Sequence, residues 1–288
     1  MQSSEKFAVI GDPISHSKSP QLHNEFGKEF KLKLSYDKIH THSSELAARV
    51  DNLIELGYRG FNVTLPLKEG MYKLGVLRGY DLSERSIRAQ SVNTVSIKKE
   101  KIFLDNTDGA GFIKSMNYPH GFNWHKKNLL IIGAGGAAKG IIGPILDVHP
   151  ARITISNRSL KKIKLLRERF SSPLLSFNLL NDLNSDSNLN DYENTGSFDV
   201  IVNATSSSVS MEDSLINPKY FRNAQLIVDL FYAKKLTSFL RVAKEYGCIN
   251  VMDGFPMLVE QAAESFYVWT GLKPDTNRII SQRDIFFE

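Results

Sequence analysis

Short apolar runs alternate with longer segments of helical periodicity along the whole chain. This alternation predicts an α/β fold with parallel sheets covered by helices, rather than an all-β sandwich. The first runs read as a βαβ unit, in which Pro20 suits the first turn of a helix and Gly57 suits a helix stop. The expected strands are Phe7–Ile10, Leu34–Ile39, Gly60–Val63 and Val92–Ile97, and the expected helices are Pro20–Phe30 and Ser44–Leu56.

A second group of apolar runs has the spacing of a Rossmann-type sheet. The polar segment Asn106–Gly111 interrupts the apolar pattern before this group, so we expect the joint between two domains there. Asn181–Ser197 is rich in Asn, Asp and Ser, which predicts a long surface loop. The expected strands of the second sheet are Leu129–Ile132, Arg152–Ile155, Asp199–Val202, Leu226–Leu230 and Ile249–Met252, and a later helix carries an apolar stripe of Leu258, Ala262, Phe266 and Trp269.

Composition narrows the class of protein. The 288 residues are 42% hydrophobic and 23% charged, which is ordinary for a globular protein and excludes disordered and fibrous classes. No run approaches the roughly 18 apolar residues of a membrane span, and the start MQSSEKFAVI lacks the apolar core of a signal peptide. We therefore expect a cytoplasmic protein without a membrane partner. Cys248 is the only cysteine, so an intramolecular disulfide and a cysteine-based metal site are excluded.

The net charge is +5, which fits either nucleic acid or an anionic small molecule. Basic residues are scattered over Lys28–Lys38, Lys98–Lys101 and Arg158–Arg169 without interleaved aromatic residues or a nucleic-acid-binding motif. Most of these charges are therefore interpreted as solvated helix faces, and no nucleic-acid partner is expected. The seven histidines show no metal-ligand spacing such as HExxH, so no metal is expected.

A glycine-rich run, GAGGAAKG, follows the apolar strand LLII and fits the GxGxxA pattern with Ala138 in the third position. Gly133 allows the tight turn, Gly135 allows the backbone to approach a pyrophosphate, and the following helix supplies N–H groups and positive potential. The alternative is a glycine-rich turn without a ligand. The residues predicted to hold the pyrophosphate are Gly133, Ala134, Gly135, Gly136 and Ala137.

After the next strand comes SNRSLKK, where an NAD enzyme usually has an acidic residue for the ribose hydroxyls. Here Arg158 can form a planar fork on a 2′-phosphate, Ser159 can donate a hydrogen bond, and Lys162 adds a charge. This segment predicts NADP as cofactor. The alternative is a basic helix start at the surface.

Two further groups of polar residues can bind and transform a small acid. Ser17 and Ser19 precede the helix that Pro20 opens, so their hydroxyls and the free N–H groups can receive a carboxylate. Lys68 follows a strand, and with Asp108 as partner its ammonium can donate a proton to a carbonyl oxygen as hydride arrives. Alone, the serines could be a simple helix entry, Lys68 and Asp108 surface charges, and Asp108 a helix cap.

The order of nine strings resembles the shikimate dehydrogenase family over nearly the whole chain. The strings are GDPISHSKSPQLHN, FNVTLPLK, SVNTV, DNTDG, GAGGAAKG, NRS, NATS, DLFY and DGFPMLVEQA. The resemblance implies a substrate-binding domain at 1–107, completed by a C-terminal helical part at 254–288, and an NADP-binding Rossmann domain at 108–253. It also implies reversible NADPH-dependent reduction of 3-dehydroshikimate to shikimate, in the aromatic amino-acid pathway, with the substrate in a cleft between domains.

The resemblance implies roles for individual residues. Ser17, Ser19 and Tyr232 would bind the substrate carboxylate, and Lys68 with Asp108 would form the catalytic pair. The ring hydroxyls would be bound by Thr64, Asn93 and Gln261, with Asp108 also accepting one of them. On the cofactor side, the 2′-phosphate and adenosine would be held by Asn157, Arg158, Ser159 and Lys162, and the nicotinamide would be flanked by Leu230 and Gly254.

Two departures from the family pattern affect the cofactor side. Phe255 and Pro256 replace a common Leu-Gly pair, which predicts a stiffer backbone beside the nicotinamide, and Lys162 stands where Arg is frequent. Two alternatives stay open: a quinate or dual quinate/shikimate dehydrogenase using NAD, and a non-enzymatic NADP-binding sensor. Retention of both Lys68 and Asp108 speaks against the sensor. The sequence leaves the choice between monomer and homodimer open.

Overall fold

The computed structural model describes residues 4–99, 101–118, 121–185, 197–205 and 216–287. Its internal contacts divide the chain into two compact units. Unit 1 comprises Met1–Ser115 and Leu258–Phe286 with Glu288, and unit 2 comprises Met116–Met257 with Phe287. The segment Asp108–Ser115, expected in the second domain, therefore groups with unit 1, where Asp108 forms an ion pair with Lys68.

Unit 1 is built on a six-stranded sheet in the order β2-β1-β3-β5-β6-β4. β1 is parallel to both β2 and β3, whereas β5 is antiparallel to β3 and to β6. The sheet thus differs from the expected parallel arrangement at one interior strand, β5, which runs antiparallel to both of its neighbours. Strands β4 and β6 were not predicted. The strands are β1 (Glu5–Gly11), β2 (Leu34–His40), β3 (Gly60–Val63), β4 (Asp81–Leu82), β5 (Thr94–Lys98) and β6 (Lys101–Asp105).

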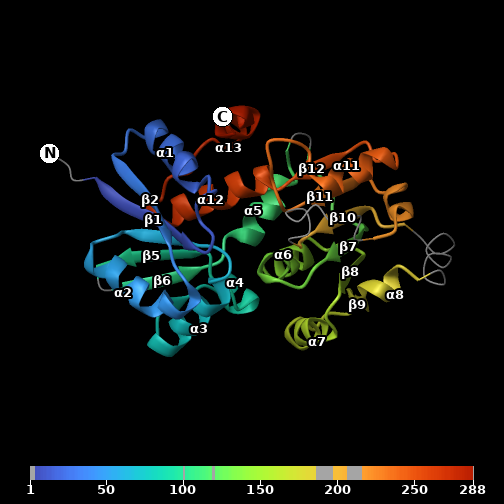
Figure 1. Ribbon diagram of the computed structural model, residues 1–288, viewed down its shortest axis with the longest axis horizontal. Helices are drawn as coiled ribbons and strands as arrows, with labels where there is room; N and C mark the ends of the chain where they lie inside the picture. Colours follow the sequence, from blue (N-terminus) through green and yellow to red (C-terminus); the bar gives the residue numbers. More distant parts are fainter. Residues whose placement is uncertain (1–3, 100, 119–120, 186–196, 206–215, 288) are drawn as a thin grey trace. The chain divides into compact units, whose positions relative to one another are not determined.

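Helices cover both faces of this sheet, with α2 and α3 on one side and α1 and α12 on the other (Figure 1). Alternation along β1 explains the two layers, because successive side chains of a strand point to opposite faces. Ala8 and Ile10 belong to the cluster with α2 and α3, and Phe7 and Val9 belong to the cluster with Trp269 of α12. The helical elements are α1 (Ser19–Glu29), η1 (Ser43–Glu45), α2 (Leu46–Glu55), α3 (Lys68–Arg78), α4 (Glu84–Ala89), α5 (Asp108–Ser115), α12 (Phe255–Thr270), α13 (Thr276–Ser281) and η3 (Arg283–Phe286).

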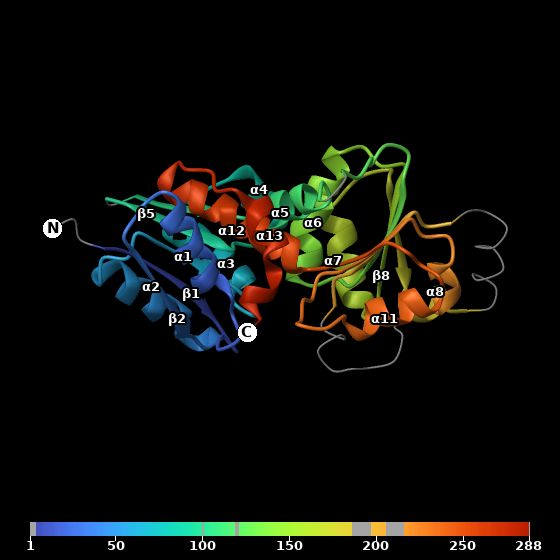
Figure 2. The ribbon, with the colours of Figure 1, turned by 90° about the horizontal axis from the view of Figure 1, so that it is seen from above.

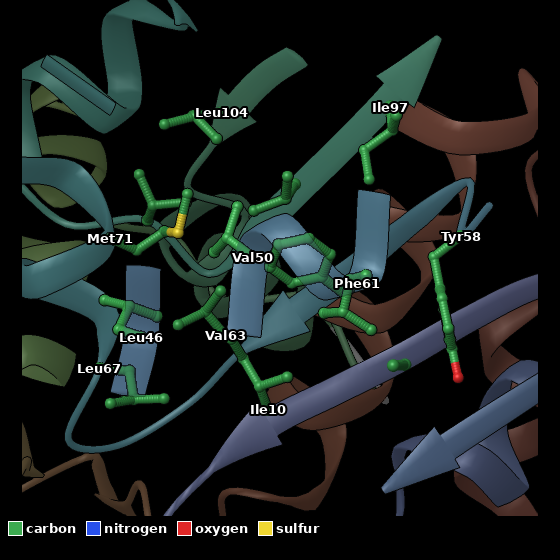
Figure 3. Packing of buried hydrophobic residues seen from close by; sticks show 14 residues of the cluster. Ile10, Leu46, Val50, Tyr58, Phe61, Val63, Leu67, Met71, Ile97 and Leu104 are labelled. Carbon is green, nitrogen blue, oxygen red and sulfur yellow. The ribbon is translucent and has the colours of Figure 1, made fainter. Parts of the chain in front are cut away.

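The larger of these clusters fills the space between the sheet and helices α2 and α3 (Figure 3). Phe61 and Val63 of β3 project into it together with Val50 of α2 and Met71 of α3. All four side chains are buried, and each fully buried side chain of this size contributes about 1.5–3 kcal/mol relative to exposure. This core fixes the ends of β3 and the start of α3, where Thr64 and Lys68 lie.

On the other face, α12 is held to unit 1 by aromatic packing and one hydrogen bond. The Trp269 ring stacks on Phe7 with centroids 4.7 Å apart, and its Nε1–H donates to the Val95 carbonyl at 2.9 Å. The predicted apolar stripe of this helix therefore faces the core of unit 1. His23 of α1 is buried in the same layer, stacked on Tyr36 with centroids 4.6 Å apart.

Unit 2 contains a sheet in the order β12-β11-β10-β7-β8-β9, in which all pairings are parallel. Numbered within the unit, this order is the one typical of Rossmann domains, with the change of direction between β7 and β10. The strands are β7 (Asn128–Ile132), β8 (Arg152–Asn157), β9 (Leu175–Leu179), β10 (Val200–Asn203), β11 (Leu226–Asp229) and β12 (Val251–Asp253). β9 was not predicted, and the expected loop Asn181–Ser197 starts within helix α8 and otherwise falls largely outside the described residues.

Helices α6 and α7 lie on one side of this sheet, and α8 and α11 lie on the other (Figure 2). The α11 side forms a core of Leu130, Ile201, Ile227 and Leu240, while Trp124 is buried elsewhere in the unit, edge-on to Phe122. No helix within the described ranges is both long and apolar enough to cross a membrane. The helical elements are α6 (Gly136–Asp147), α7 (Leu160–Arg169), α8 (Leu180–Leu183), η2 (Pro218–Phe221) and α11 (Ser238–Glu245).

Candidate active site

The two predicted carboxylate-binding serines lie at the entrance to α1. The Ser17 hydroxyl donates to Ser19 Oγ at 3.2 Å, and the Ser19 N–H donates to Ser17 Oγ at 3.3 Å. Ser19 is the first residue of the helix, and the first-turn N–H groups of a helix lack intrahelical partners. Two hydroxyls beside these N–H groups form a suitable receptor for an anion.

A buried polar chain leads from Ser19 into the sheet. The Tyr36 hydroxyl interacts with Ser19 and donates to Asn62 Oδ1 at 2.6 Å, while the Asn62 amide donates to the Asn93 carbonyl at 3.0 Å. Burial raises the pKa of Tyr36, and the Ser19 hydrogen bond only partly opposes this, so the phenol stays protonated and can donate. Neither Tyr36 nor Asn62 was predicted as a site residue, although a polar Asn62 within the buried strand FNV was a usable signal.

Lys68 and Asp108 form a close pair. Lys68 is the first residue of α3, Asp108 is the first residue of α5, and Lys68 Nζ lies 2.6 Å from Asp108 Oδ2. The side chains retain only 15% and 6% of their exposed surface, so this ion pair is partly removed from water. A charge-assisted hydrogen bond in such surroundings orients the ammonium strongly.

Asn93 and Gln261 extend the pair into a group of donors and acceptors. Asn93 Nδ2 donates to Asp108 Oδ1 at 2.8 Å and lies 3.2 Å from Gln261 Oε1. Gln261 is supplied by α12, so residues distant in sequence meet in unit 1. The carboxylate of Asp108 is thus held through one oxygen by Lys68 and through the other by Asn93.

Two hydroxyl residues that were not predicted support this group. Thr107 Oγ1 lies 2.9 Å from Asn93 Nδ2 and donates to the Gln261 carbonyl at 3.0 Å, and Ser265 Oγ lies 2.7 Å from Thr94 Oγ1. Thr64 lies between β3 and α3, where its N–H donates to the Ile10 carbonyl at 2.9 Å. Ser17, Ser19, Thr64, Lys68, Asn93, Asp108 and Gln261 all belong to unit 1.

In unit 2, the glycine-rich turn joins β7 to α6. Gly133 has φ of +119°, and a Cβ there would lie 2.9 Å from the Ala204 carbonyl oxygen, so glycine is required. Around Gly135 and Gly136 a Cβ would meet no atom within 4 Å, which leaves the backbone open to a ligand. Gly135 caps α6, and the buried Ala138 allows the close helix packing expected of the third position. These features fit a pyrophosphate at the helix N-terminus.

The next loop follows β8 and carries the predicted 2′-phosphate group of residues. Asn157 ends the strand, Arg158 and Lys162 are exposed, and Ser159 caps α7 by accepting a hydrogen bond from the Lys162 N–H at 3.4 Å. Capping uses a lone pair of Ser159 and leaves its O–H able to donate to an anion. The arrangement fits a nucleotide with a 2′-phosphate better than one with two free ribose hydroxyls.

The remaining predicted residues lie after β11 and β12 in unit 2. A Cβ on Gly254 would lie 2.1 Å from the Leu230 carbonyl oxygen, so the two backbones pass in direct contact. Pro256 falls in the first turn of α12, where its missing N–H breaks no helical hydrogen bond, and Phe255 is fully buried. The Phe-Pro replacement is therefore accommodated as a regular helix start.

Tyr232 also belongs to unit 2, where its ring packs near Phe231 and Phe287. Burial and the charge of Asp253 raise the pKa of Tyr232 to about 12, so it remains a donor.

Asn203 and Thr205 of the NATS string were assigned no role, yet Asn203 Oδ1 accepts from the Thr205 hydroxyl at 2.7 Å and Thr205 lies beside Gly133. Their position at the end of strand β10, where the sheet changes direction, was the available signal.

Within the described ranges, no group of three or more His, Cys, Asp or Glu residues could hold a metal ion. The strand order of unit 2, its glycine-rich turn and its basic loop are those of dinucleotide-binding α/β proteins. They place the protein in that class. Unit 1 adds a lysine–aspartate pair in a polar group suited to a hydroxylated acid.

Comparison with known proteins agrees with this class and refines it. The family description "Shikimate dehydrogenase substrate binding domain" matches residues 9–95, "Shikimate / quinate 5-dehydrogenase" matches 117–232, and "Shikimate 5'-dehydrogenase C-terminal domain" matches 254–282. A shikimate dehydrogenase (NADP(+)) from Dechloromonas aromatica is 36% identical over 282 residues, covering 97% of each chain.

Solved structures match the chain over nearly its whole length. The Ael1 enzyme from Pseudomonas putida is 34% identical with a TM-score of 0.85, covering 97% of this chain and 98% of that one. A shikimate 5-dehydrogenase from Thermus thermophilus, in complex with NADP(H) and shikimate, is 30% identical with a TM-score of 0.83, covering 98% of this chain and all (100%) of that one. The chain belongs to the shikimate dehydrogenase family.

Proposed function

We propose that the protein is an NADP-dependent shikimate dehydrogenase that interconverts 3-dehydroshikimate and shikimate in the aromatic amino-acid pathway. The observation that carries the proposal is the Lys68–Asp108 pair at 2.6 Å, surrounded by Asn93 and Gln261. A proton donor beside hydroxyl-binding groups suits a ring that carries both a carbonyl and hydroxyls. The sequence identity to NADP(+)-dependent relatives supports the same assignment.

In this proposal unit 1 supplies most of the groups that bind the substrate. Ser17 and Ser19 donate hydrogen bonds to the carboxylate, and the family resemblance adds Tyr232 of unit 2 as a further phenolic donor. Thr64, Asn93 and Gln261 bind ring hydroxyls, which gives the site its preference for a polyhydroxylated acid. Asp108 accepts one substrate hydroxyl while its other oxygen holds Lys68.

The chemical step depends on Lys68. In the reducing direction its ammonium donates a proton to the substrate carbonyl oxygen, and in the oxidising direction the neutral amine takes the proton back. Asp108 orients the amine through the hydrogen bond of 2.6 Å between them. NADPH, when bound, supplies the hydride that the carbonyl carbon accepts.

The residues of unit 2 fit NADP. The turn Gly133–Ala137 would hold the pyrophosphate, and the 2′-phosphate would lie against Asn157, Arg158, Ser159 and Lys162. Leu230 and Gly254 would flank the nicotinamide. The proposal also includes a cytoplasmic enzyme acting as monomer or homodimer, which cell fractionation and sedimentation would test.

Initial rates with shikimate or quinate, each with NADP⁺ or NAD⁺, test the proposed function directly. We expect kcat/KM to be highest for shikimate with NADP⁺. Preference for quinate with NAD⁺ would identify the rival dehydrogenase instead. Cofactor binding without turnover of either acid would identify the non-enzymatic sensor.

A further inference from the structure

Arg85 lies at the meeting point of three elements of unit 1. It stands in the first turn of α4, where Ser83 caps the helix and Ser83 and Ser86 both bond to the neighbouring strand β6. Its guanidinium forms a two-pronged pair with Asp105, from Nε to Oδ1 at 2.7 Å and from Nη2 to Oδ2 at 2.5 Å. A third nitrogen, Nη1, reaches Glu264 of α12 at 3.5 Å.

Asp105 connects this fork to the loop that presents Asp108. The Asp105 side chain is 3% exposed, and its Oδ1 also accepts from the Ser83 hydroxyl at 2.6 Å and the Asn106 N–H at 2.7 Å. Asn106 in turn accepts from the Asp108 N–H at 3.1 Å. The guanidinium is therefore linked to the backbone of Asp108 through two successive side-chain-to-backbone hydrogen bonds.

Glu264 connects the same guanidinium to the helix that presents Gln261. Residues three apart on a helix lie on one face, so Glu264 shares a face of α12 with Gln261. Glu264 also binds Lys114 of α5, which ties the end of that helix to α12. Both helices approach closely here, because a Cβ on Gly111 would lie 2.6 Å from the Gln261 nitrogen.

The strength of the Asp105 pair supports a persistent link. Burial by itself would raise the pKa of Asp105, but the hydrogen bonds and charge of Arg85 outweigh it and the pKa is lowered. The forked geometry is specific to arginine, because a lysine ammonium offers a point charge without two parallel N–H groups.

We propose that Arg85 is a positioning residue of the dehydrogenase, which sets Asp108 through Asp105 and Gln261 through Glu264. The inference rests on the proposed function. The two connections of Arg85, to Asp108 through Asp105 and to Gln261 through Glu264, should have different kinetic consequences. Misplacing Asp108 disturbs the amine that transfers the proton, whereas misplacing Gln261 disturbs a group that holds substrate.

Steady-state kinetics of Arg85→Lys and Glu264→Gln, with Arg78→Lys as control, test this. Arg78 makes an equivalent fork with Asp51, at 2.5 and 3.0 Å, on the surface of the same unit. Arg85→Lys should lower kcat by about 10- to 100-fold, the effect of a small misplacement of a reacting group, with a smaller change in the shikimate KM. Glu264→Gln should raise KM more than it lowers kcat, and Arg78→Lys should leave both values unchanged.

A double variant separates positioning from general destabilisation. If Arg85 acts through Asp108, Arg85→Lys should lower kcat little further in an Asp108→Asn background, since coupled residues are not additive. Wild-type kcat and KM in Arg85→Lys, or an equal loss of kcat in both backgrounds, would overturn the inference. If Arg85→Lys does not fold, an unchanged shikimate KM in Glu264→Gln overturns it. An inactive wild type would instead refute the proposed function.

Discussion

Lys68 and Ser17 illustrate two different ways in which a single residue can serve the proposed reaction. Lys68 is held by Asp108 at 2.6 Å and can transfer a proton, whereas Ser17 can only hold an anion beside the start of α1. A group that acts in the transition state affects kcat, and a group that binds substrate and transition state equally affects KM. The two residues should therefore separate in kinetic measurements.

Replacing Lys68 with Ala should lower kcat by about 10²- to 10⁴-fold, the usual contribution of a positioned general acid or base, with a smaller change in the shikimate KM. Ser17→Ala should mainly raise KM, because it removes a hydrogen bond to a charged group worth about 1.5–3 kcal/mol. Lys73→Ala, an exposed lysine on the same helix as Lys68, is the matched control. Near-normal kcat in folded Lys68→Ala protein would rule out the acid/base role.

The proposed role of Arg158 is tested by comparing the affinities of the protein for NADP⁺ and for NAD⁺. Arg158→Ala should weaken NADP⁺ binding by about 1.5–3 kcal/mol and leave NAD⁺ binding almost unchanged, because only NADP⁺ carries the 2′-phosphate. Calorimetric titration with both cofactors measures this. Arg152 begins the same strand that Arg158 follows, so Arg152→Ala is a control of equal charge. Equal weakening of both cofactors by Arg158→Ala would contradict the phosphate assignment.

At the scale of elements, the close approach of α5 and α12 depends on Gly111. A methyl group there would lie 2.6 Å from the Gln261 nitrogen and 2.8 Å from its Cα, and backbone atoms cannot move aside as a flexible side chain can. The two helices carry Asp108 and Gln261, so their spacing is part of the site.

Gly111→Ala should therefore lower the free energy of unfolding by about 1–3 kcal/mol, the usual cost of overpacking, and reduce kcat/KM at the same time. Gly70→Ala is the control, since its Cβ would meet only the end of the Leu46 side chain, at 3.1 Å. Denaturant unfolding and steady-state rates measure the two effects. A fully stable and active Gly111→Ala protein would show that the helices can separate without consequence.

Hydrophobic periodicity predicted most elements, because the strands of both sheets are apolar runs and the helices are amphipathic. It missed three strands, β4, β6 and β9: a two-residue strand such as β4 has no periodicity, and KIFLD of β6 begins with a charge. It also missed the antiparallel direction of β5, because pairing direction depends on contacts distant in sequence. Motifs predicted the residues gathered around Lys68. They did not predict Tyr36, Thr107 or Arg85, whose roles depend on three-dimensional neighbours.

At the scale of the molecule, one buried histidine couples stability to pH. His23 is 1% exposed, and neither ring nitrogen has a hydrogen-bond partner among the described residues. Burial lowers the pKa of His23 to about 3, and the nearby Asn62 offsets this only in part. In the unfolded chain a histidine has a pKa of about 6.5, so the unfolded state takes up the proton first as the pH falls.

The folded state should consequently lose stability as the pH falls from about 6.5 towards 3. At pH 5 the loss from His23 should be about 2 kcal/mol relative to pH 7, from 1.36 kcal/mol per pKa unit. In His23→Phe the difference in unfolding free energy between pH 7 and pH 5 should shrink by about that amount. His125→Gln, at an exposed position, is the control. An unchanged pH dependence in His23→Phe would contradict the buried neutral histidine.

The sequence contains two tryptophans, and each unit holds one of them in its interior: Trp269 in unit 1 and Trp124 in unit 2. Indole emission shifts to longer wavelength when water reaches the ring, so each tryptophan is an intrinsic optical label for its own unit. In a Trp124→Phe protein the indole emission comes from Trp269 alone, so it follows the melting of the layer around His23 in unit 1. The reciprocal Trp269→Phe protein reports on the dinucleotide-binding unit, and the two curves reveal whether the units melt together or in sequence.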